Sequence, residues 1–303
     1  MSIEVPYRHE MEFAYGDPAQ VSPLIRRIVA PNPSAFTLYG TNTYLVGRGL
    51  VAVIDPGPAH EEHLAALASA LDGETVTHIL VTHTHLDHSP TAQTLAEHTG
   101  APTLGFGPHG GPGPEIAFDE GVVITEGGDL DFVPDEALRH GDRIEGPDWH
   151  LTVVHTPGHT SNHLCFALAE ERSLFTGDHV MGWSTSVVIP PDGEMDTYLE
   201  SLRLLLERDD AVLWPGHGPA IDDPGKYLTA LLAHRAEREA EILEFLERGP
   251  ARIGDMVPVI YAAVDPRLHP AAGLSVLAHL IALAADGRVR CDGEPGLEAE
   301  FEI

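Results

Sequence analysis

The most constraining feature of this chain is a dense group of histidines and a carboxylate directly after an apolar run. The run Ile79-Leu-Val is followed by His83-Thr-His85-Leu-Asp87-His88. Such a run predicts a buried strand, and residues i and i+2 at an extended strand end project to the same side. His83 and His85 can therefore reach one metal ion, while Asp87 and His88 face a neighbouring position as the chain turns into a helix. We expect this loop to supply ligands to two adjacent ions.

Three further ligand-type residues follow other predicted strands, and each stands next to a glycine. They are His159 in Thr-Pro-Gly-His-Thr, Asp178 in Phe-Thr-Gly-Asp and His217 in Trp-Pro-Gly-His-Gly. Glycine lets backbone approach closely, and loops at strand ends often carry functional groups. We expect three nitrogen ligands in the first site: His83, His85 and His159. We expect the second site to use Asp87, His88 and His217, with Asp178 bridging the two sites.

The first two thirds of the chain alternate short apolar runs with helical periodicity, which indicates a layered α/β architecture. Strands are predicted at 43–46, 51–54, 79–81, 151–154, 163–168, 173–175 and 211–214. Helices are predicted at 60–70, 90–98 and 196–207. The Gly- and Pro-rich segment 105–128 lacks the Gly-Lys-Ser/Thr ending of a phosphate-binding loop, so we expect a surface loop whose His109 does not reach a substrate.

The C-terminal part reads as helices at 227–247, 253–262 and 274–285, and the segment 288–291 then starts a short hairpin-like tail. Three helices followed by a strand pair outline a winged helix. We therefore expect a catalytic domain over 1–222 and a helical domain over 223–303. The third helix has no Lys or Arg to meet phosphates, so we expect no DNA binding. It is predicted to pack, either as a wall of the active-site cleft or as a homodimer surface.

The net charge and the cysteine and histidine contents restrict the classes of function that this chain can have. Seventeen Lys and Arg against 47 Asp and Glu give a formal net charge of −30, which repels polyanions. Two cysteines cannot make a disulfide framework, whereas 19 histidines are unusually many. The N-terminus lacks the pattern of a signal peptide, and no uninterrupted apolar stretch approaches the length of a membrane helix. We expect a cytoplasmic protein without a membrane segment.

The ligand pattern resembles that of the metallo-β-lactamase superfamily. The resemblance implies a four-layer αββα sandwich over about residues 21–222, with the site at one edge between the sheets. Zinc β-lactamases commonly use Cys where this chain has Asp178, so an antibiotic-hydrolysing role is not expected. Asp178 is instead similar to the bridging carboxylate of glyoxalase II and ribonuclease Z relatives.

A closer resemblance extends over the whole chain. The segments 32–46, Thr156-Pro-Gly-His-Thr, Pro215-Gly-His-Gly-Pro and Ala233-His-Arg-Ala-Glu-Arg238 are similar to the β-lactamase-like protein 2 family. Members carry a small winged-helix-like domain after the catalytic domain, and at least one animal branch cuts single-stranded RNA. Bacterial members are mostly known as hydrolases of unassigned substrate.

These observations predict a dinuclear zinc hydrolase in which a metal-bridging hydroxide attacks the substrate. Iron or manganese also suits His and Asp ligands. Asp87 is the expected catalytic carboxylate, which orients the proton of the nucleophile. The substrate is expected to be a small or medium ester, thioester or lactone. The alternative is a metal-dependent endoribonuclease for single-stranded RNA, which the net charge disfavours, although Arg235 and Arg238 could offset it locally.

Several further residues are candidates for supporting roles. Asp55 ends a predicted strand and is expected to orient a ligand imidazole. His163 has two readings: it either orients a ligand in the same way or is a strand residue whose ring bonds a backbone carbonyl. Asn42 and Thr43 are expected at the rim of the pocket and in contact with substrate. Thr82, Thr160 and Ser161 are weaker candidates around the ligands.

Overall fold

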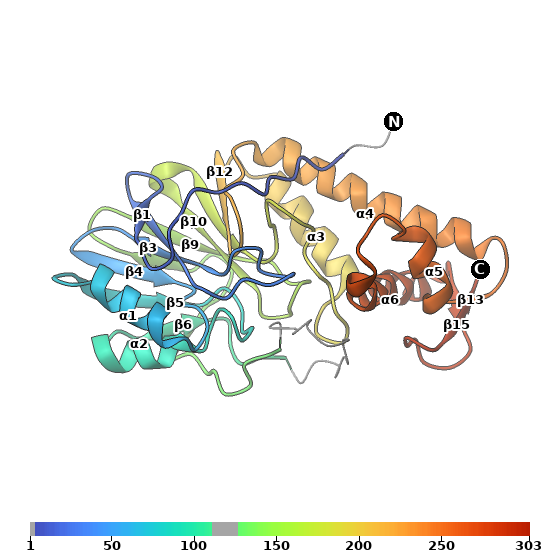
Figure 1. The fold of residues 1–303 in the computed structure, drawn as a ribbon, viewed down its shortest axis with the longest axis horizontal. Coiled ribbons are helices and arrows are strands. Elements are labelled where there is room, and N and C mark those ends of the chain that lie inside the picture. The colour runs from blue at the N-terminus through green and yellow to red at the C-terminus, as the bar shows by residue number, and fades with distance from the viewer. Residues whose placement is uncertain (1–3, 111–126) are drawn as a thin grey trace.

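The computed structural model describes residues 4–110 and 127–303 (Figure 1). Most of the predicted loop 105–128 therefore lies outside the described residues. The described helices are α1 (Glu61–Ala70), α2 (Thr91–Thr99), α3 (Met195–Leu206), α4 (Pro224–Leu246), α5 (Ile253–Ile260) and α6 (His269–Ala285). Short 3-10 turns lie at Ala169–Glu171 and Pro266–Leu268.

The strands of the described residues form three sheets. The first sheet, in spatial order, contains β1 (Ala19–Gln20), β2 (Ile25–Val29), β3 (Asn42–Val46), β4 (Leu50–Ile54), β5 (Thr75–Leu80), β6 (Thr103–Gly105) and β7 (Glu136–Ala137). The second contains β12 (Val212–Pro215), β11 (Ser173–Gly177), β10 (Leu164–Leu168), β9 (His150–His155) and β8 (Arg143–Glu145). The third contains β13 (Ala251–Arg252), β15 (Glu300–Glu302) and β14 (Arg290–Cys291).

The two large sheets pack face to face because alternate residues of their strands point inward. On β3, Tyr44 and Val46 enter the core between the sheets, whereas Leu45 between them faces the opposite side. Phe166 and Phe175 enter the same core from the second sheet. The shared core fixes the two sheets against each other and so fixes the strand ends that carry the predicted ligands.

Helices cover both outer faces, which gives four layers. Leu67 of α1 and Leu95 of α2 pack on the outer face of the first sheet. Tyr198 of α3 and Leu231 of α4 pack on the outer face of the second sheet. Figure 1 shows α1 and α2 on one side of the sheets and α3 and α4 on the other. The predicted αββα sandwich is confirmed, and so is the C-terminal winged-helix arrangement of α5, α6 and the small third sheet.

The long helix α4 belongs to two cores. Leu228 and Leu231 in its first half pack with α3 and the second sheet. Ile242 and Leu246 in its second half pack with α5, α6 and the third sheet. A boundary between residues 222 and 223 therefore assigns to the C-terminal domain a half-helix whose side chains lie in the catalytic core.

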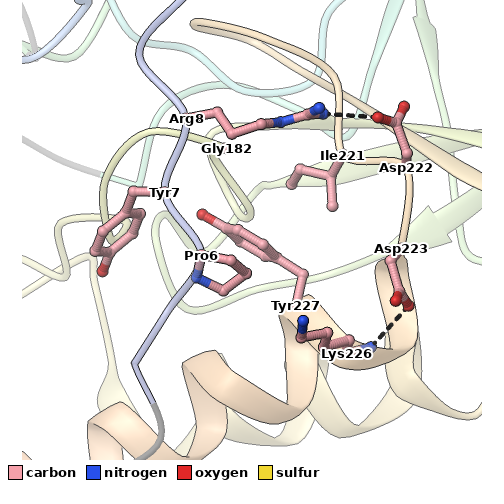
Figure 2. Close-up of a pocket in the computed structure, with 9 residues that line it drawn as sticks. All are labelled: Pro6, Tyr7, Arg8, Gly182, Ile221, Asp222, Asp223, Lys226 and Tyr227. Atoms are coloured by element: carbon pink, nitrogen blue, oxygen red, sulfur yellow. Dashed lines mark hydrogen bonds and ion pairs between the residues drawn. The ribbon is translucent and has the colours of Figure 1, made fainter.

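The start of α4 is anchored by an N-cap and by the N-terminal arm (Figure 2). The Asp223 side chain accepts a hydrogen bond from the Lys226 backbone amide, as expected for an N-cap residue. Arg8 of the arm pairs with Asp222 at 2.9 Å, with both side chains largely exposed.

One described segment, Pro266–Ala285, is long and apolar enough to cross a membrane by length and composition, with a mean hydropathy of 1.6. In the structure, 56% of this window is buried inside the protein. Core helices of globular proteins pass the same test, so the finding is weak evidence for a membrane span.

Candidate metal centre

Four loops bring the predicted ligands together at one edge of the two sheets. The loop after β5 carries His83 to His88, and the loop between β9 and β10 carries His159. Asp178 directly follows β11, and His217 follows β12. A hydrogen bond of 2.7 Å from the Asn42 amide to the Gly216 carbonyl joins the two sheets beside the site. All seven predicted ligands are buried: His83, His85, Asp87, His88, His159, Asp178 and His217.

The first group consists of three converging imidazoles. His83 Nε2 lies 3.0 Å from His85 Nδ1, and His159 Nε2 lies 3.2 Å from the same atom. A neutral imidazole carries a proton on only one of its two nitrogens. Some of these three converging ring nitrogens therefore present lone pairs to one another in a buried space. This arrangement matches the predicted first site.

The second group combines two imidazoles with carboxylates. His88 Nε2 and His217 Nε2 are 3.3 Å apart. Asp87 Oδ2 lies 3.4 Å from His88 Nε2 and 3.1 Å from His217 Nε2. These three residues form the predicted second set of donors.

Asp178 lies between the two groups. Its oxygens are 3.4 Å from His88 Nε2 and 3.2 Å from His217 Nε2, and together with His83 and His88 it forms a third group of donors. Gly216 is required for this approach. A Cβ atom at that position would lie 2.4 Å from Asp178 Oδ1 and 2.8 Å from the His88 ring.

The electrostatics differ between the two groups. Burial lowers the pKa of His83, His85 and His159, and neighbouring imidazoles lower those of His83 and His85 further. These rings are therefore neutral at pH 7, as metal ligation requires.

In the second group the pKa values of the imidazoles are raised instead of lowered. Burial alone would lower the pKa of His217, but Asp178 and Asp87 raise it to about 10. Burial would likewise raise the pKa of both carboxyls, yet the His88 and His217 rings hold them below their usual range. A divalent cation held by these residues would take the place of the imidazole protons.

Outer hydrogen bonds fix the orientation of the ligand rings. Asp55 Oδ2 lies 2.9 Å from His88 Nδ1, as expected for the predicted orienting role. The same carboxylate accepts hydrogen bonds from the amide and the hydroxyl of Thr82, at 2.8 and 2.7 Å. His159 Nδ1 lies 2.6 Å from the Val187 carbonyl oxygen, and His217 Nδ1 lies 3.2 Å from that of Gly40.

His163 receives neither of its two expected hydrogen bonds. Its Nδ1 lies 2.9 Å from the Thr156 hydroxyl, and its Nε2 has no hydrogen-bond partner among the described residues. Its ring packs against His83, with centroids 5.1 Å apart. The His163 ring therefore contacts the His83 ring, and its one hydrogen bond among the described residues goes to a hydroxyl instead of to a ligand ring or a backbone carbonyl.

Asn42 and Thr43 do not lie at an accessible rim. Both are fully buried. The Asn42 side chain donates to the carbonyls of Pro215 and Gly218, at 3.0 Å each. The Thr43 hydroxyl donates to the Asp55 carbonyl at 2.7 Å. Both residues join neighbouring backbone segments, because β3 runs through the centre of the first sheet.

Two residues near the centre were not expected there. The Thr41 hydroxyl donates to Asp87 Oδ2 at 3.2 Å. His109, expected away from the substrate, has its ring centroid 6.0 Å from that of His85, and its Nδ1 lies 2.9 Å from the Thr84 hydroxyl. Thr41 directly precedes β3, and nothing in its sequence context singled it out from its neighbours. The Gly-rich context of His109 is typical of a surface loop.

The residues fit a pair of divalent cations. Buried oxygens Asp87 Oδ1 and Asp178 Oδ1 have no hydrogen-bond partner among the described residues, although isolated buried carboxylate oxygens are costly. His83 and His88 each belong to two of the three donor groups. Overlapping groups of nitrogen and carboxylate donors are suited to two neighbouring first-row metal ions.

The fold and this donor set together define a metal-dependent hydrolase. A model of the metallo-β-lactamase superfamily matches residues 36–217, and a model of the β-lactamase-associated winged-helix domain matches residues 253–297. The first match covers more than half of the chain, so the chain belongs to the metallo-β-lactamase superfamily.

Individual relatives agree with this assignment. The chain is 34% identical to a β-lactamase-like protein 2 homolog of Drosophila melanogaster, over 87% of this chain and 89% of that protein. It is 31% identical to an atrochrysone carboxyl ACP thioesterase of Paecilomyces divaricatus, over 95% and 88% of the two chains. A β-lactamase domain protein from Burkholderia ambifaria has the same fold, with a TM-score of 0.79, 21% identity and coverage of 98% and 96%.

Proposed function

We propose that this hydrolase cleaves thioesters with two zinc ions held by the seven converging ligands. The observation that carries the proposal is the overlap of the three buried donor groups through His83 and His88. The preference for a thioester over other scissile bonds is supported by the thioesterases among its relatives.

Divalent cations bound here would supply Lewis acidity, which polarises a carbonyl group and makes water nucleophilic at neutral pH. The protein contributes position and proton handling. Thr41 donates to Asp87 Oδ2, whereas Asp87 Oδ1 has no hydrogen-bond partner within residues 4–110 and 127–303. We infer that Oδ1 accepts a hydrogen bond from the attacking water and so orients it.

The environment of Cys165 argues against a covalent route through this thiol. It is completely buried on β10, its side chain packs in the core beneath α3 and α4, and its sulfur lies 3.2 Å from the Thr156 hydroxyl. Burial raises the pKa of this thiol to about 12, so it is not ionised at neutral pH. Attack by water is therefore the proposed route.

The first experiment measures metal content and thioester hydrolysis on the same preparations. We expect about two zinc ions per chain by elemental analysis, and release of thiol from acyl thioesters of N-acetylcysteamine. His83→Ala should lose metal and activity together. His98→Ala, on the exposed end of α2, is the matched control and should keep both.

Three results would overturn parts of this proposal. Full metal content and activity in His83→Ala would refute the site. Iron or manganese at full occupancy with full activity would refute zinc. Cleavage of labelled single-stranded RNA that follows metal loading, without thioester hydrolysis, would replace the substrate class.

A further inference from the structure

A groove with a volume of about 800 Å³ lies between the catalytic domain and α6. One wall is an apolar face of α6 that includes Leu277, Ile281, Ala282 and Ala285. The opposite wall is the segment from Pro190 to Asp196, which leads into α3. The volume falls in the range of about 300–1,000 Å³ that small-molecule sites occupy.

The groove adjoins the loop that carries the metal ligand His159. The Glu194 amide donates to the carbonyl of Gly158 at 2.9 Å, and the Ser161 amide donates to Asp192 Oδ2 at 3.2 Å. Glu194, Asp192 and Ser161 all line the groove. A molecule held in the groove therefore lies against the backbone segment that positions His159.

The charges of the groove select against anions. Asp192, Glu194 and Asp196 contribute carboxylates to it, and no Lys or Arg is among the described residues that line it. Burial, together with the nearby carboxylates of Asp286 and Glu194, raises the pKa of Asp196. A phosphate-rich or carboxylate-bearing ligand would be repelled here.

The composition of α6 agrees with such a groove. Val276, Leu280 and Leu283 face the core of the C-terminal domain, and Ala278 faces the catalytic core. Ile281 packs at the edge of the first of these cores and Ala282 at the edge of the second, and both remain partly exposed. Ala285, one turn further on, is exposed. A ligand in the groove would cover the apolar surface that the two cores leave open.

We propose that this groove binds the uncharged, apolar acyl or aryl group of the thioester that is cleaved at the metal centre. The proposal rests on the proposed function and assigns the substrate selectivity to α6 rather than to the ligand loops. Each methylene buried in an apolar site improves binding by about fourfold, so a long acyl chain gains strongly over a short one.

The test compares acetyl and decanoyl thioesters of N-acetylcysteamine on the metal-loaded enzyme. We expect kcat/KM for the decanoyl substrate to exceed that for the acetyl substrate at least about tenfold. A decanoyl chain that ends in a carboxylate should lose most of this advantage. Ala282→Phe, which fills the groove, should lower kcat/KM for the decanoyl substrate about tenfold and leave the acetyl substrate within about twofold.

Ala284→Phe lies on the same helix but does not line the groove, and should change neither value. Ala285→Trp, at an exposed lining position, provides a second groove variant if Ala282→Phe does not fold. Equal losses for the two substrates, or a decanoyl preference that survives both groove variants, would overturn the proposal.

A binding experiment separates this inference from the proposed function. The decanoyl amide, in which nitrogen replaces the scissile sulfur, is titrated into the metal-loaded enzyme by calorimetry. If no thioester is hydrolysed but the amide binds to the wild type and not to Ala282→Phe, the groove is a binding site for the acyl group and the proposed thioesterase function is wrong. If the amide does not bind, or binds both proteins equally, the groove assignment is wrong.

Discussion

The Nδ1 atom of His88 lies 2.9 Å from Oδ2 of Asp55, and both side chains are buried. The carboxylate is held in turn by the amide and hydroxyl of Thr82. Asp55 therefore connects the ends of β4 and β5 to a ligand of the second group.

We predict that Asp55→Asn weakens metal binding by about 10- to 100-fold, because an amide holds the His88 ring less firmly and makes it less basic. Competition with a chromophoric chelator measures the affinity. Asp72→Asn changes an exposed carboxylate beyond α1 and should bind metal like the wild type. Unchanged affinity in Asp55→Asn would show that the hydrogen bond does not tune His88.

We predict that Gly216→Ala lowers metal affinity at least about tenfold. The new methyl group would lie 2.4 Å from Asp178 Oδ1, so the carboxylate or the His88 ring has to move. Gly225→Ala at the start of α4 meets no atom within 4 Å and should keep affinity, with equal or slightly higher stability. Calorimetric metal titration of both variants checks the pair, and equal affinities would contradict the crowding argument.

Arg235 on α4 connects the helical domain to the metal centre. It is buried, its guanidinium donates to the Ser186 carbonyl, and it lies over the ring of Tyr198 at 5.2 Å. The next residue, Val187, accepts the hydrogen bond from His159 Nδ1. Ser186 and Val187 thus link α4 to the His159 ring, so a shift of Arg235 can move that ring.

We predict that Arg235→Ala lowers the free energy of unfolding by about 2–4 kcal/mol, because a buried charge-assisted hydrogen bond and its packing are lost. Metal affinity should fall as well, and Arg235→Lys should recover part of it. Arg203→Ala, at an exposed position of α3, is the control. If stability fell without any loss of metal affinity, Arg235 would contribute packing alone.

His279 on α6 predicts a dependence of stability on pH. Burial, together with the positive charge of Arg235 and the His234 ring, lowers its pKa from the ordinary 6.5 to about 3. The unfolded chain therefore binds a proton that the folded protein does not. The contribution of His279 to stability is complete above about pH 6.5 and is lost as the pH falls towards 3.

Denaturant unfolding at pH 4 to 6 tests this relationship. We expect His279→Leu to reduce the slope of unfolding free energy against pH by about 1.4 kcal/mol per pH unit relative to the wild type. Val276→Ala, a buried and non-titrating neighbour on α6, should lower stability by a similar amount at every pH. Parallel curves for His279→Leu and the wild type would refute the neutral buried imidazole.

Much of the site was predictable because its ligands follow strands of strong apolar pattern. The His83–His88 segment and the Gly-flanked His159 and His217 combine unusual residue types with recognisable strand ends. The structure gathers these residues into three donor groups. Their chemistry could be inferred without knowing how the sheets pack.

The strand β2 had no such signal. Arg26 and Arg27 interrupt its apolar pattern, yet all five of its residues are buried. Arg26 pairs with Glu74 at 2.6 Å, and Arg27 donates to the Glu12 carbonyl at 3.0 Å. These tertiary partners make the strand possible, and both lie outside the segment whose pattern predicts a strand.

Backbone acceptors were also beyond sequence reasoning. The carbonyl groups of Val187 and Gly40 orient two ligand rings. Because every residue carries a carbonyl group, the sequence does not reveal which of them will do so. Asn42 and Thr43 illustrate the converse. They were expected at the rim of the pocket, but they satisfy buried backbone groups of neighbouring segments.

The continuity of α4 has a consequence for how substrates enter. A single helix that is embedded at one end among the sheets and at the other in the winged-helix core offers no hinge, so rotation of the appended domain would require broken helical hydrogen bonds. We therefore expect the groove between α6 and the segment 190–196 to keep the same width with and without a bound ligand.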